Sequence, residues 1–377
     1  MSSSGLRPSK NSARSQRKLD PLDGASNNLF VTTRRQFLAT ASLGSVAAAV
    51  GQVADNTPAS PVAREQPLGE PLFRFLQIND THYQSPQAEV ISPTYRHANG
   101  RVHWVLDAIR SGKVFPALDF ILHVGDMTHQ TTVDRREELR IFKALLDSLP
   151  IPVYTVVGNH DNVQGEGVPE LEAPYREVFG DKFNYSFVHQ GIGFVAVDTS
   201  GTAMPKLPAA AVALRERKLR ENLAALGERP IIVASHVPLL PVREMPVLEK
   251  SFGFPSSVVR EPGVLEIVRE HRGRIVAVLS GHLHISGTVW DAGVAHINVC
   301  GTASYPHDIA LHTVHTQALE TRLVRLPSDL LEPTTCIHGA RRWGRDFTDA
   351  GHPDYTSYLM GTASERLVRV PLRRGLK

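Results

Sequence analysis

The sequence predicts an α/β fold in which buried, mostly parallel strands alternate with amphipathic helices. Several short runs of β-branched and aromatic residues lack polar interruptions, which is typical of strands buried on both faces. Between two of these runs, Leu139, Phe142 and Leu146 recur at helical spacing and predict one covered helix. At least six or seven strands are expected, so the alternation indicates one large layered domain.

The expected elements follow one another from residue 72 onward. Strands are expected at 72–80, 118–126, 151–157, 230–236, 274–284 and 294–302. Residues 183–199 resemble a hairpin that turns near Gly191. A charged helix follows it, with Leu219, Leu223 and Leu226 on one face.

The first 51 residues have the parts of an export signal. A basic, serine-rich start precedes Arg34 and Arg35, which stand before Phe-Leu and a weakly apolar stretch at 39–51. This arrangement resembles a twin-arginine signal, so we expect transient contact with the twin-arginine machinery and a periplasmic or extracellular location. The alternative is a basic tail with a chance arginine pair, and the protein would then be cytoplasmic. The apolar stretch is too short for a stable membrane span.

The charge of the chain is concentrated at its start. Residues 1–51 hold seven of the 41 Lys and Arg residues but only two of the 38 acidic ones, so the remainder carries −2. That balance argues against a stable nucleic-acid partner. After the signal we expect a linker at 52–70, the folded domain at 71–325 and a C-terminal extension at 326–377.

The chain holds only two cysteines, Cys300 and Cys336. That number excludes a disulfide scaffold and a cysteine-rich zinc site. Cys300 lies in an expected strand, which favours a buried thiol over a nucleophile. A disulfide between the two cysteines outside the cytoplasm is the open alternative.

Five segments end in side chains that bind metal ions, and most of them follow an expected strand. In α/β proteins such groups meet at the carboxyl ends of the strands. The candidate ligands are Asp80, His82, Asp126, Asn159, His236, His282 and His284. Oxygen donors mixed with imidazole, without thiolate, suit manganese, iron, zinc, cobalt or nickel.

Seven ligand groups are more than one ion can use while it leaves room for water and substrate. Two ions that share one carboxylate are therefore the natural count. Two divalent ions together with Asp80 and Asp126 leave the site positive, which favours a phosphate ester as the substrate. The alternative is that these groups are structural histidines and turn residues.

In this order the motifs resemble those of the calcineurin-like metallophosphoesterases, over roughly residues 72–310. The motifs are Asp80-x-His82, Gly125-Asp126, Gly158-Asn159-His160-Asp161, His236 and Gly281-His282-x-His284. The resemblance implies a sandwich of two mixed β-sheets flanked by helices, with the site at the carboxyl ends of the strands. It also implies in-line attack by a metal-bound hydroxide on a phosphate ester.

The resemblance assigns a role to each motif residue. The first ion would be held by Asp80, His82 and His284, the second by Asn159, His236 and His282, and Asp126 would bridge them. The two ions would be manganese, iron or zinc. His160 would protonate the leaving oxygen, and Asp161 would position His160.

Two positions differ from the purple acid phosphatases within this family. His129 stands where those enzymes have a tyrosine, and His82 stands where they have a glycine. The pattern is closer to the group of bacterial cyclic-nucleotide phosphodiesterases, so a small-molecule phosphodiester is favoured over a monoester. A catalytically silent scaffold and a nuclease of the same fold are the alternatives, and the complete ligand set favours the enzyme.

Other polar residues lie near the expected mouth of the site. His123 is expected to be buried and hydrogen-bonded inside a strand. Residues that could line the pocket, but that are more often ordinary loop residues, are Arg96, His97, His129, Tyr305 and His307.

Overall fold

The structure is a computed structural model that describes part of the chain. The described residues are 68–86, 95–129, 132, 134–163, 165–201, 207–246, 248, 257–331 and 355–373. The chain divides into two units, residues 1–62 and 63–377. The predicted export signal with Arg34 and Arg35, and also Cys336, lie outside the described residues. No helix in the described part combines the length and apolar character needed to cross a bilayer.

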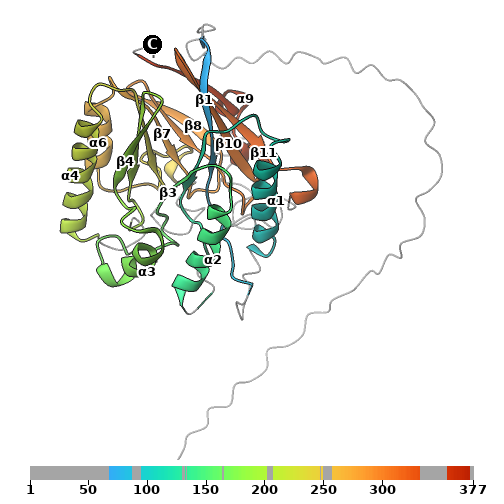
Figure 1. The fold of residues 1–377 in the computed structure, drawn as a ribbon. Coiled ribbons are helices and arrows are strands. Elements are labelled where there is room, and N and C mark those ends of the chain that lie inside the picture. Colours follow the sequence, from blue (N-terminus) through green and yellow to red (C-terminus); the bar gives the residue numbers. More distant parts are fainter. Residues whose placement is uncertain are drawn as a thin grey trace, which may run out of the picture. The chain divides into compact units, whose positions relative to one another are not determined.

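Two six-stranded mixed sheets form the centre of the second unit (Figure 1). The first sheet has the strand order β12-β11-β10-β1-β2-β3. In that order its strands are Leu367–Pro371, Ala318–Arg325, Asp308–His315, Pro71–Ile78, Phe120–Val124 and Val153–Val156. The strands β1, β2 and β3 pair in parallel, whereas the other neighbours pair antiparallel.

The second sheet has the strand order β4-β5-β6-β7-β9-β8. In that order its strands are Tyr185–His189, Ile192–Val197, Ile231–Ser235, Ile275–Ser280, Val294–Asn298 and Gly287–Asp291. The four strands from β5 to β9 in this order are parallel, and antiparallel hairpin partners flank them on both sides. The predicted hairpin is the β4–β5 pair, and the predicted sandwich of two mixed sheets is confirmed.

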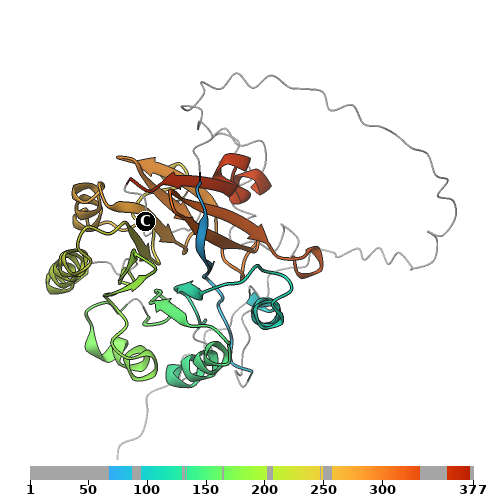
Figure 2. The ribbon, with the colours of Figure 1, turned by 45° about the horizontal axis from the view of Figure 1, so that its top comes forward.

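Helices lie around the two sheets, and Figure 2 shows them beside the central strands. They are α1 (Ala98–Ser111), α2 (Arg135–Asp147), α3 (Pro169–Phe179), α4 (Ala209–Ala225), α6 (Gly263–Glu270), α8 (Tyr355–Met360), α9 (Ala363–Arg366) and the 3-10 helix η2 (Ser328–Leu330). The buried faces of α1 and α2 pack on the first sheet, and those of α4 and α6 pack on the second. The leucine stripes predicted for α2 and α4 are these buried faces.

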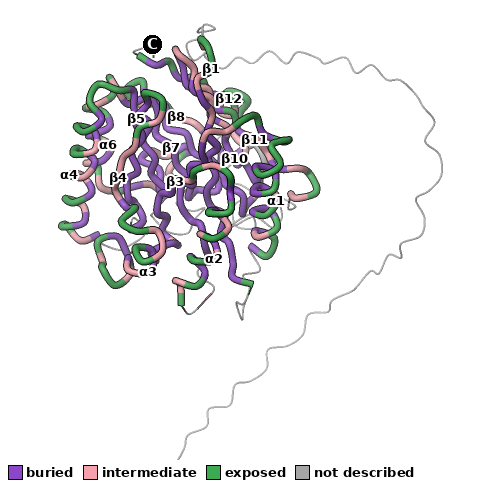
Figure 3. Tube along the Cα trace, viewed as in Figure 1, coloured by how far each residue is buried: buried purple, intermediate pink, exposed green. Residues whose placement is uncertain are grey.

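The two sheets pack face to face through a core rich in aromatic rings. Phe75 and Phe120 from the first sheet stack with 5.0 Å between their ring centroids. Phe194 from the second sheet meets both rings edge-on at 5.4 Å. Figure 3 shows buried residues through the centre and exposed ones on the outer helices. Burial of such large apolar rings is the main force that holds two sheets together.

Hydrogen bonds also join the two sheets at the edge where the ligand loops begin. Gln77, near the end of β1, donates from Nε2 to the carbonyl of Ser280 at the end of β7 (3.1 Å). Two residues further on, Asn79 donates to the carbonyl of Val299, which directly follows β9 of the second sheet (2.8 Å). Because all four groups are buried, these bonds fix how the two strand ends face each other.

Four strands were not predicted, namely β8, β10, β11 and β12. The C-terminal extension was expected to be irregular, yet its residues Leu367–Pro371 add the edge strand β12 to the first sheet. Val368 and Val370 point into the core while Leu367 and Arg369 face outward. The alternation of apolar and polar residues was visible in the sequence. A segment of this length forms a strand only when it pairs with a sheet, and the sequence does not show that pairing.

Candidate metal centre

The ligand loops have an unusual backbone conformation. Residues other than glycine rarely adopt positive φ angles, and they do so chiefly where the surrounding structure enforces it. Five predicted ligands adopt them: Asp80 (46°), His82 (40°), Asp126 (52°), His282 (68°) and His284 (51°). Each loop therefore turns sharply as its strand ends, and the concentration of strain marks a functional site.

Three motif glycines allow these loops to approach one another. A Cβ atom on Gly125 would lie 2.4 Å from Nδ1 of His236, and one on Gly281 would lie 2.4 Å from Oδ2 of Asp80. A Cβ atom on Gly158 would lie 2.1 Å from the backbone nitrogen of Asp126. The glycines of the motifs are thus required by the closeness of the ligands.

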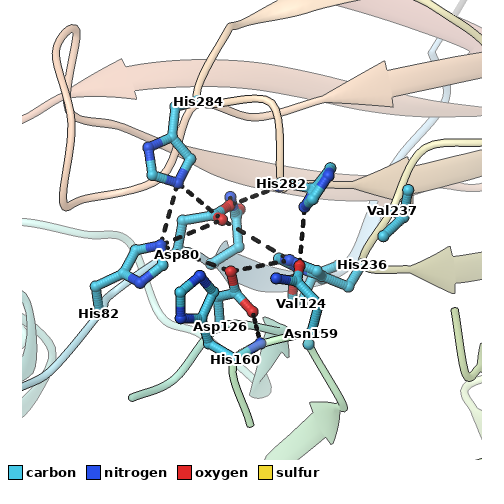
Figure 4. Close-up of polar contacts among 12 residues, drawn as sticks. Asp80, His82, Val124, Asp126, Asn159, His160, His236, Val237, His282 and His284 are labelled. Carbon is cyan, nitrogen blue, oxygen red and sulfur yellow. Dashed lines mark hydrogen bonds and ion pairs between the residues drawn. The ribbon is translucent and has the colours of Figure 1, made fainter. Parts of the chain in front are cut away.

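The first predicted ligand group is assembled in the structure (Figure 4). Asp80, His82 and His284 bring one ligand atom each within 4.8 Å of one another. Nε2 of His284 lies 3.1 Å from Nε2 of His82 and 3.2 Å from Oδ1 of Asp80. All three side chains are buried, so their donor atoms face a shared space rather than bulk solvent.

The second group contains Asp126, His236 and His282, whose ligand atoms also lie within 4.8 Å of one another. Asn159 joins them because its Oδ1 atom lies 2.9 Å from Nδ1 of His282. Nδ1 of His236 lies 2.8 Å from the carbonyl of Val124, which turns Nε2 toward the site.

Asp126 lies between the two groups. Its Oδ2 atom is 3.2 Å from Nε2 of His236 and 3.6 Å from Nε2 of His82. Its other oxygen, Oδ1, accepts a hydrogen bond from the backbone of His160 (2.9 Å). The carboxylate is therefore fixed by one oxygen while the other faces both groups, which is the placement a bridging ligand needs.

Two buried polar atoms test whether this set of residues fits a metal centre. Within the described part of the chain, Oδ1 of Asp80 and Nε2 of His236 make no hydrogen bond, although each has an ion-pair partner 3.2 Å away, Nε2 of His284 and Oδ2 of Asp126 respectively. Oδ2 of Asp80 is already bonded to Nδ2 of Asn79 (2.6 Å) and to the backbone of His282 (2.9 Å). Buried polar atoms that make no hydrogen bond are costly, and cations that bind nitrogen and oxygen ligands would satisfy these two. The residues fit such ions.

The electrostatics also favour cations at this position. Burial opposes ionisation of Asp80 and Asp126, but the neighbouring histidines outweigh burial and lower the pKa of both carboxyl groups. Burial likewise opposes protonation of His236, yet Asp126 and Asp80 raise its pKa to about 10. Two buried carboxylates thus create a field that retains positive charge, either as protons or as metal ions.

Sequence similarity to known proteins decides the family. A model of the calcineurin-like phosphoesterase family matches residues 73–286, more than half of the chain, and this segment contains all seven predicted ligands. The chain belongs to the calcineurin-like phosphoesterase family.

Two relatives illustrate the match. A curated protein of Arcobacter nitrofigilis, "Probable glycerophosphodiester phosphodiesterase GpdQ", is 24% identical over 241 residues, which cover 63% of this chain and 80% of the relative. The crystal structure of a dimetal phosphatase from Danio rerio has a TM-score of 0.50 and 17% identity, and the match covers 67% of this chain and 96% of the other. The second likeness supports the fold.

His160 and Asp161 of this calcineurin-like phosphoesterase lie beside the ligand groups. The ring of His160 meets that of His82 edge-on, with 4.8 Å between centroids. The carboxylate of Asp161 accepts hydrogen bonds from the backbone of Gly158 (2.8 Å) and Met127 (2.9 Å). Asp161 therefore ties together the two loops that carry His160 and Asp126.

The remaining candidate residues of the sequence analysis lie in different surroundings. His129 is brought to the site, where its Nδ1 atom lies 3.3 Å from Nδ1 of His82. His123 is buried and bonded to the hydroxyl of Thr81 (3.1 Å), as predicted. For the others the structure shows no contact with the assembled ligand atoms: Arg96 and His97 are exposed, Tyr305 packs near Met360, and His307 is buried against the carbonyl of Thr302. Within the described part of the chain, Cys300 is a free, buried thiol.

The sequence analysis missed Tyr95. Its ring is buried and lies parallel to the ring of His82, with 4.4 Å between centroids and 1° between planes. The neighbouring Arg96 was named instead, because a positive charge suggests phosphate binding. Nothing in the sequence around Tyr95 indicates a contact with His82, which lies 13 residues away.

We predict that Gly158→Ala destabilises the fold because the new methyl group would collide with the backbone of Asp126. Overpacking of this kind costs about 1–3 kcal/mol, measured as the free energy of unfolding in urea with a chelator present. Gly100→Ala in α1 is the matched control, since its methyl group meets nothing within 4 Å and a helical alanine gains up to about 1 kcal/mol. Equal stability of the two variants would contradict the steric argument.

Proposed function

We propose that this calcineurin-like phosphoesterase is a binuclear metal-dependent hydrolase that cleaves phosphodiesters of small molecules. The observation that carries the proposal is the placement of Oδ2 of Asp126 between the two ligand groups, 3.6 Å from one histidine and 3.2 Å from another. The two ions would be manganese, iron or zinc, because the donors are imidazole, carboxylate and amide oxygen.

Each ion would have ligands from both sheets. The first would be held by Asp80, His82 and His284, the second by Asn159, His236 and His282, with Asp126 shared. When bound, the ions would polarise a phosphoryl oxygen and lower the pKa of the attacking water. The protein itself contributes a rigid, buried frame, since the loops are fixed by the hydrogen bonds of Asp80, Asp126 and Asp161. Such preorganisation removes the cost of arranging charges during the reaction.

His160 would give the proton that the leaving oxygen needs. Its ring is half-buried at the site, and its backbone is anchored by Oδ1 of Asp126. A group held beside the ions but not fully enclosed by protein can reach the leaving oxygen of a bound ester. Asp161 would support this role through the loop backbone.

A diester is favoured over a monoester by the relative from Arcobacter nitrofigilis, whose name describes a glycerophosphodiester phosphodiesterase. The net charge of −2 outside the first 51 residues argues against a nucleic-acid substrate. A catalytically silent scaffold is the second candidate. It is less favoured, because a scaffold has no need to keep five strained ligand residues with positive φ.

The first test is hydrolysis of bis-p-nitrophenyl phosphate by protein that is stripped with a chelator and then resupplied with Mn²⁺. We expect the ion to restore turnover, and we expect the diester to be cleaved faster than p-nitrophenyl phosphate. Restored cleavage of the monoester alone would change the substrate class. Loss of all turnover with Mn²⁺, Fe²⁺, Zn²⁺ and Ni²⁺ would favour the scaffold.

His160→Ala should retain both ions but slow the cleavage of diesters with poor leaving groups by roughly 10²–10⁴-fold, because the proton donor is lost. The same variant should be affected less on bis-p-nitrophenyl phosphate, whose leaving group needs no proton. Metal content per chain is measured in parallel as the control. An equal loss on both substrates would count against the proton donor.

We also propose that the protein is exported by the twin-arginine route, on the basis of Arg34, Arg35 and the weakly apolar stretch after them. Arg34→Lys combined with Arg35→Lys should then keep the chain in the cytoplasm, as measured by cell fractionation in a bacterial host. Arg14→Lys combined with Arg17→Lys is the matched control, because it makes the same charge-conserving exchange outside the motif. Normal export of the double variant would remove the proposal.

A further inference from the structure

The histidines of the centre differ in what holds the ring nitrogen that faces away from the ligand group. A ligand histidine is oriented by the group that binds this other nitrogen, usually a carboxylate or a backbone carbonyl. In His236 the nitrogen meets the carbonyl of Val124 (2.8 Å), and in His284 it meets the hydroxyl of Ser304 (2.7 Å). In His82 it meets another imidazole, Nδ1 of His129, at 3.3 Å.

His82 is also held by an aromatic ring. Tyr95 lies flat on it at 4.4 Å, and the same tyrosine meets His129 edge-on at 4.7 Å. Tyr95 is only 6% exposed, and its neighbours Ala98 and Ala303 are fully buried beside it. The ring of His82 is therefore confined on one face by Tyr95 and at its Nδ1 edge by His129.

We propose that Tyr95 and His129 are positioning residues that orient His82 for the first metal ion, an inference that rests on the proposed binuclear centre. A neutral imidazole carries one proton, so His82 binds an ion through Nε2 only when Nδ1 keeps that proton. Nδ1 of His129 then accepts the hydrogen bond from Nδ1 of His82. Tyr95 fixes the plane of the same ring, so that Nε2 points toward Asp80 and His284.

The contact between His82 and His129 links a candidate ligand of the first ion to the loop that carries Asp126. His129 is three residues after Asp126, so one loop supplies both the bridging carboxylate and the group that holds a ligand of the first ion. A substitution of His129 would therefore affect the first ion more than the second, since the second ion's ligand His236 is oriented by a backbone carbonyl that substitutions leave intact.

The decisive comparison is His129→Asn against His129→Ala. The amide oxygen of asparagine occupies nearly the place of Nδ1 in histidine, so it can still accept the hydrogen bond, whereas alanine cannot. With Mn²⁺ as the probe, we expect His129→Ala to weaken binding of one of the two ions by about 10–100-fold, and His129→Asn to stay close to the wild type. Affinity is measured by titration of the metal-free protein, followed by metal analysis.

Tyr95→Phe and Tyr95→Leu form the second pair. Phenylalanine keeps the flat ring on His82 and loses the hydroxyl together with its hydrogen bond to Ser304, so the phenylalanine variant should bind the first ion much more tightly than the leucine variant. Leucine removes the flat ring and should weaken the same ion as His129→Ala. The visible absorption of Co²⁺-loaded protein provides a spectroscopic signature, which should change in the two weakened variants and be preserved in the two matched ones.

Each outcome bears on the proposal. Wild-type affinity for both ions in His129→Ala and Tyr95→Leu would overturn it while leaving the binuclear centre intact. Equal losses in the alanine and asparagine variants would also overturn it, because the hydrogen-bond acceptor would then be irrelevant. A wild-type protein that binds no Mn²⁺ would refute the proposed function and the inference together. Thermal unfolding of the metal-free variants checks that each one is folded.

Discussion

The structure depends on two carboxylates, Asp80 and Asp126, that are buried where the two sheets meet. They are 0% and 2% exposed, and burial of ionised groups is unfavourable unless opposite charge and hydrogen bonds compensate. Each carboxylate uses one oxygen to receive backbone or amide hydrogens and leaves the other facing histidines. The field of these oxygens raises the pKa of His236 to about 10, which shows how strongly the site attracts positive charge.

The sandwich makes this arrangement achievable. The parallel strands β1, β2 and β3 end at one edge of the first sheet, and β6 and β7 end beside them in the second. Loops that leave these strands must turn at once, so five ligand residues adopt positive φ and three glycines stand where a methyl group would collide. The aromatic core between the sheets and the hydrogen bond from Gln77 to Ser280 fix the position of the two sets of loops relative to each other. Local strain is thus balanced by global packing.

The calcineurin-like motifs specify the candidate ligands but leave the surroundings of each one open. The same type of side chain, histidine, is held by a backbone carbonyl at position 236, by a hydroxyl at 284 and by another histidine at 82. Backbone partners tolerate substitution of nearby side chains, whereas side-chain partners can be exchanged. In the first ligand group both histidines therefore contact side chains that a substitution would change, whereas His236 in the second contacts a backbone carbonyl.

The sequence alone determined the candidate ligands and the inner strands, because most of the candidate ligands follow a hydrophobic run closely enough to be recognised locally. The strands β1, β2, β3, β6 and β7 were expected at nearly their observed positions, as were the two helical stripes. Strands β8, β10, β11 and β12 were not. The edge strands β8 and β12 are short, and all four depend on neighbouring strands that only the folded chain provides. Tyr95 and His129 meet His82 from segments 13 and 47 residues away. Only the tertiary structure decided these contacts, because they depend on the path of three loops and not on any local pattern.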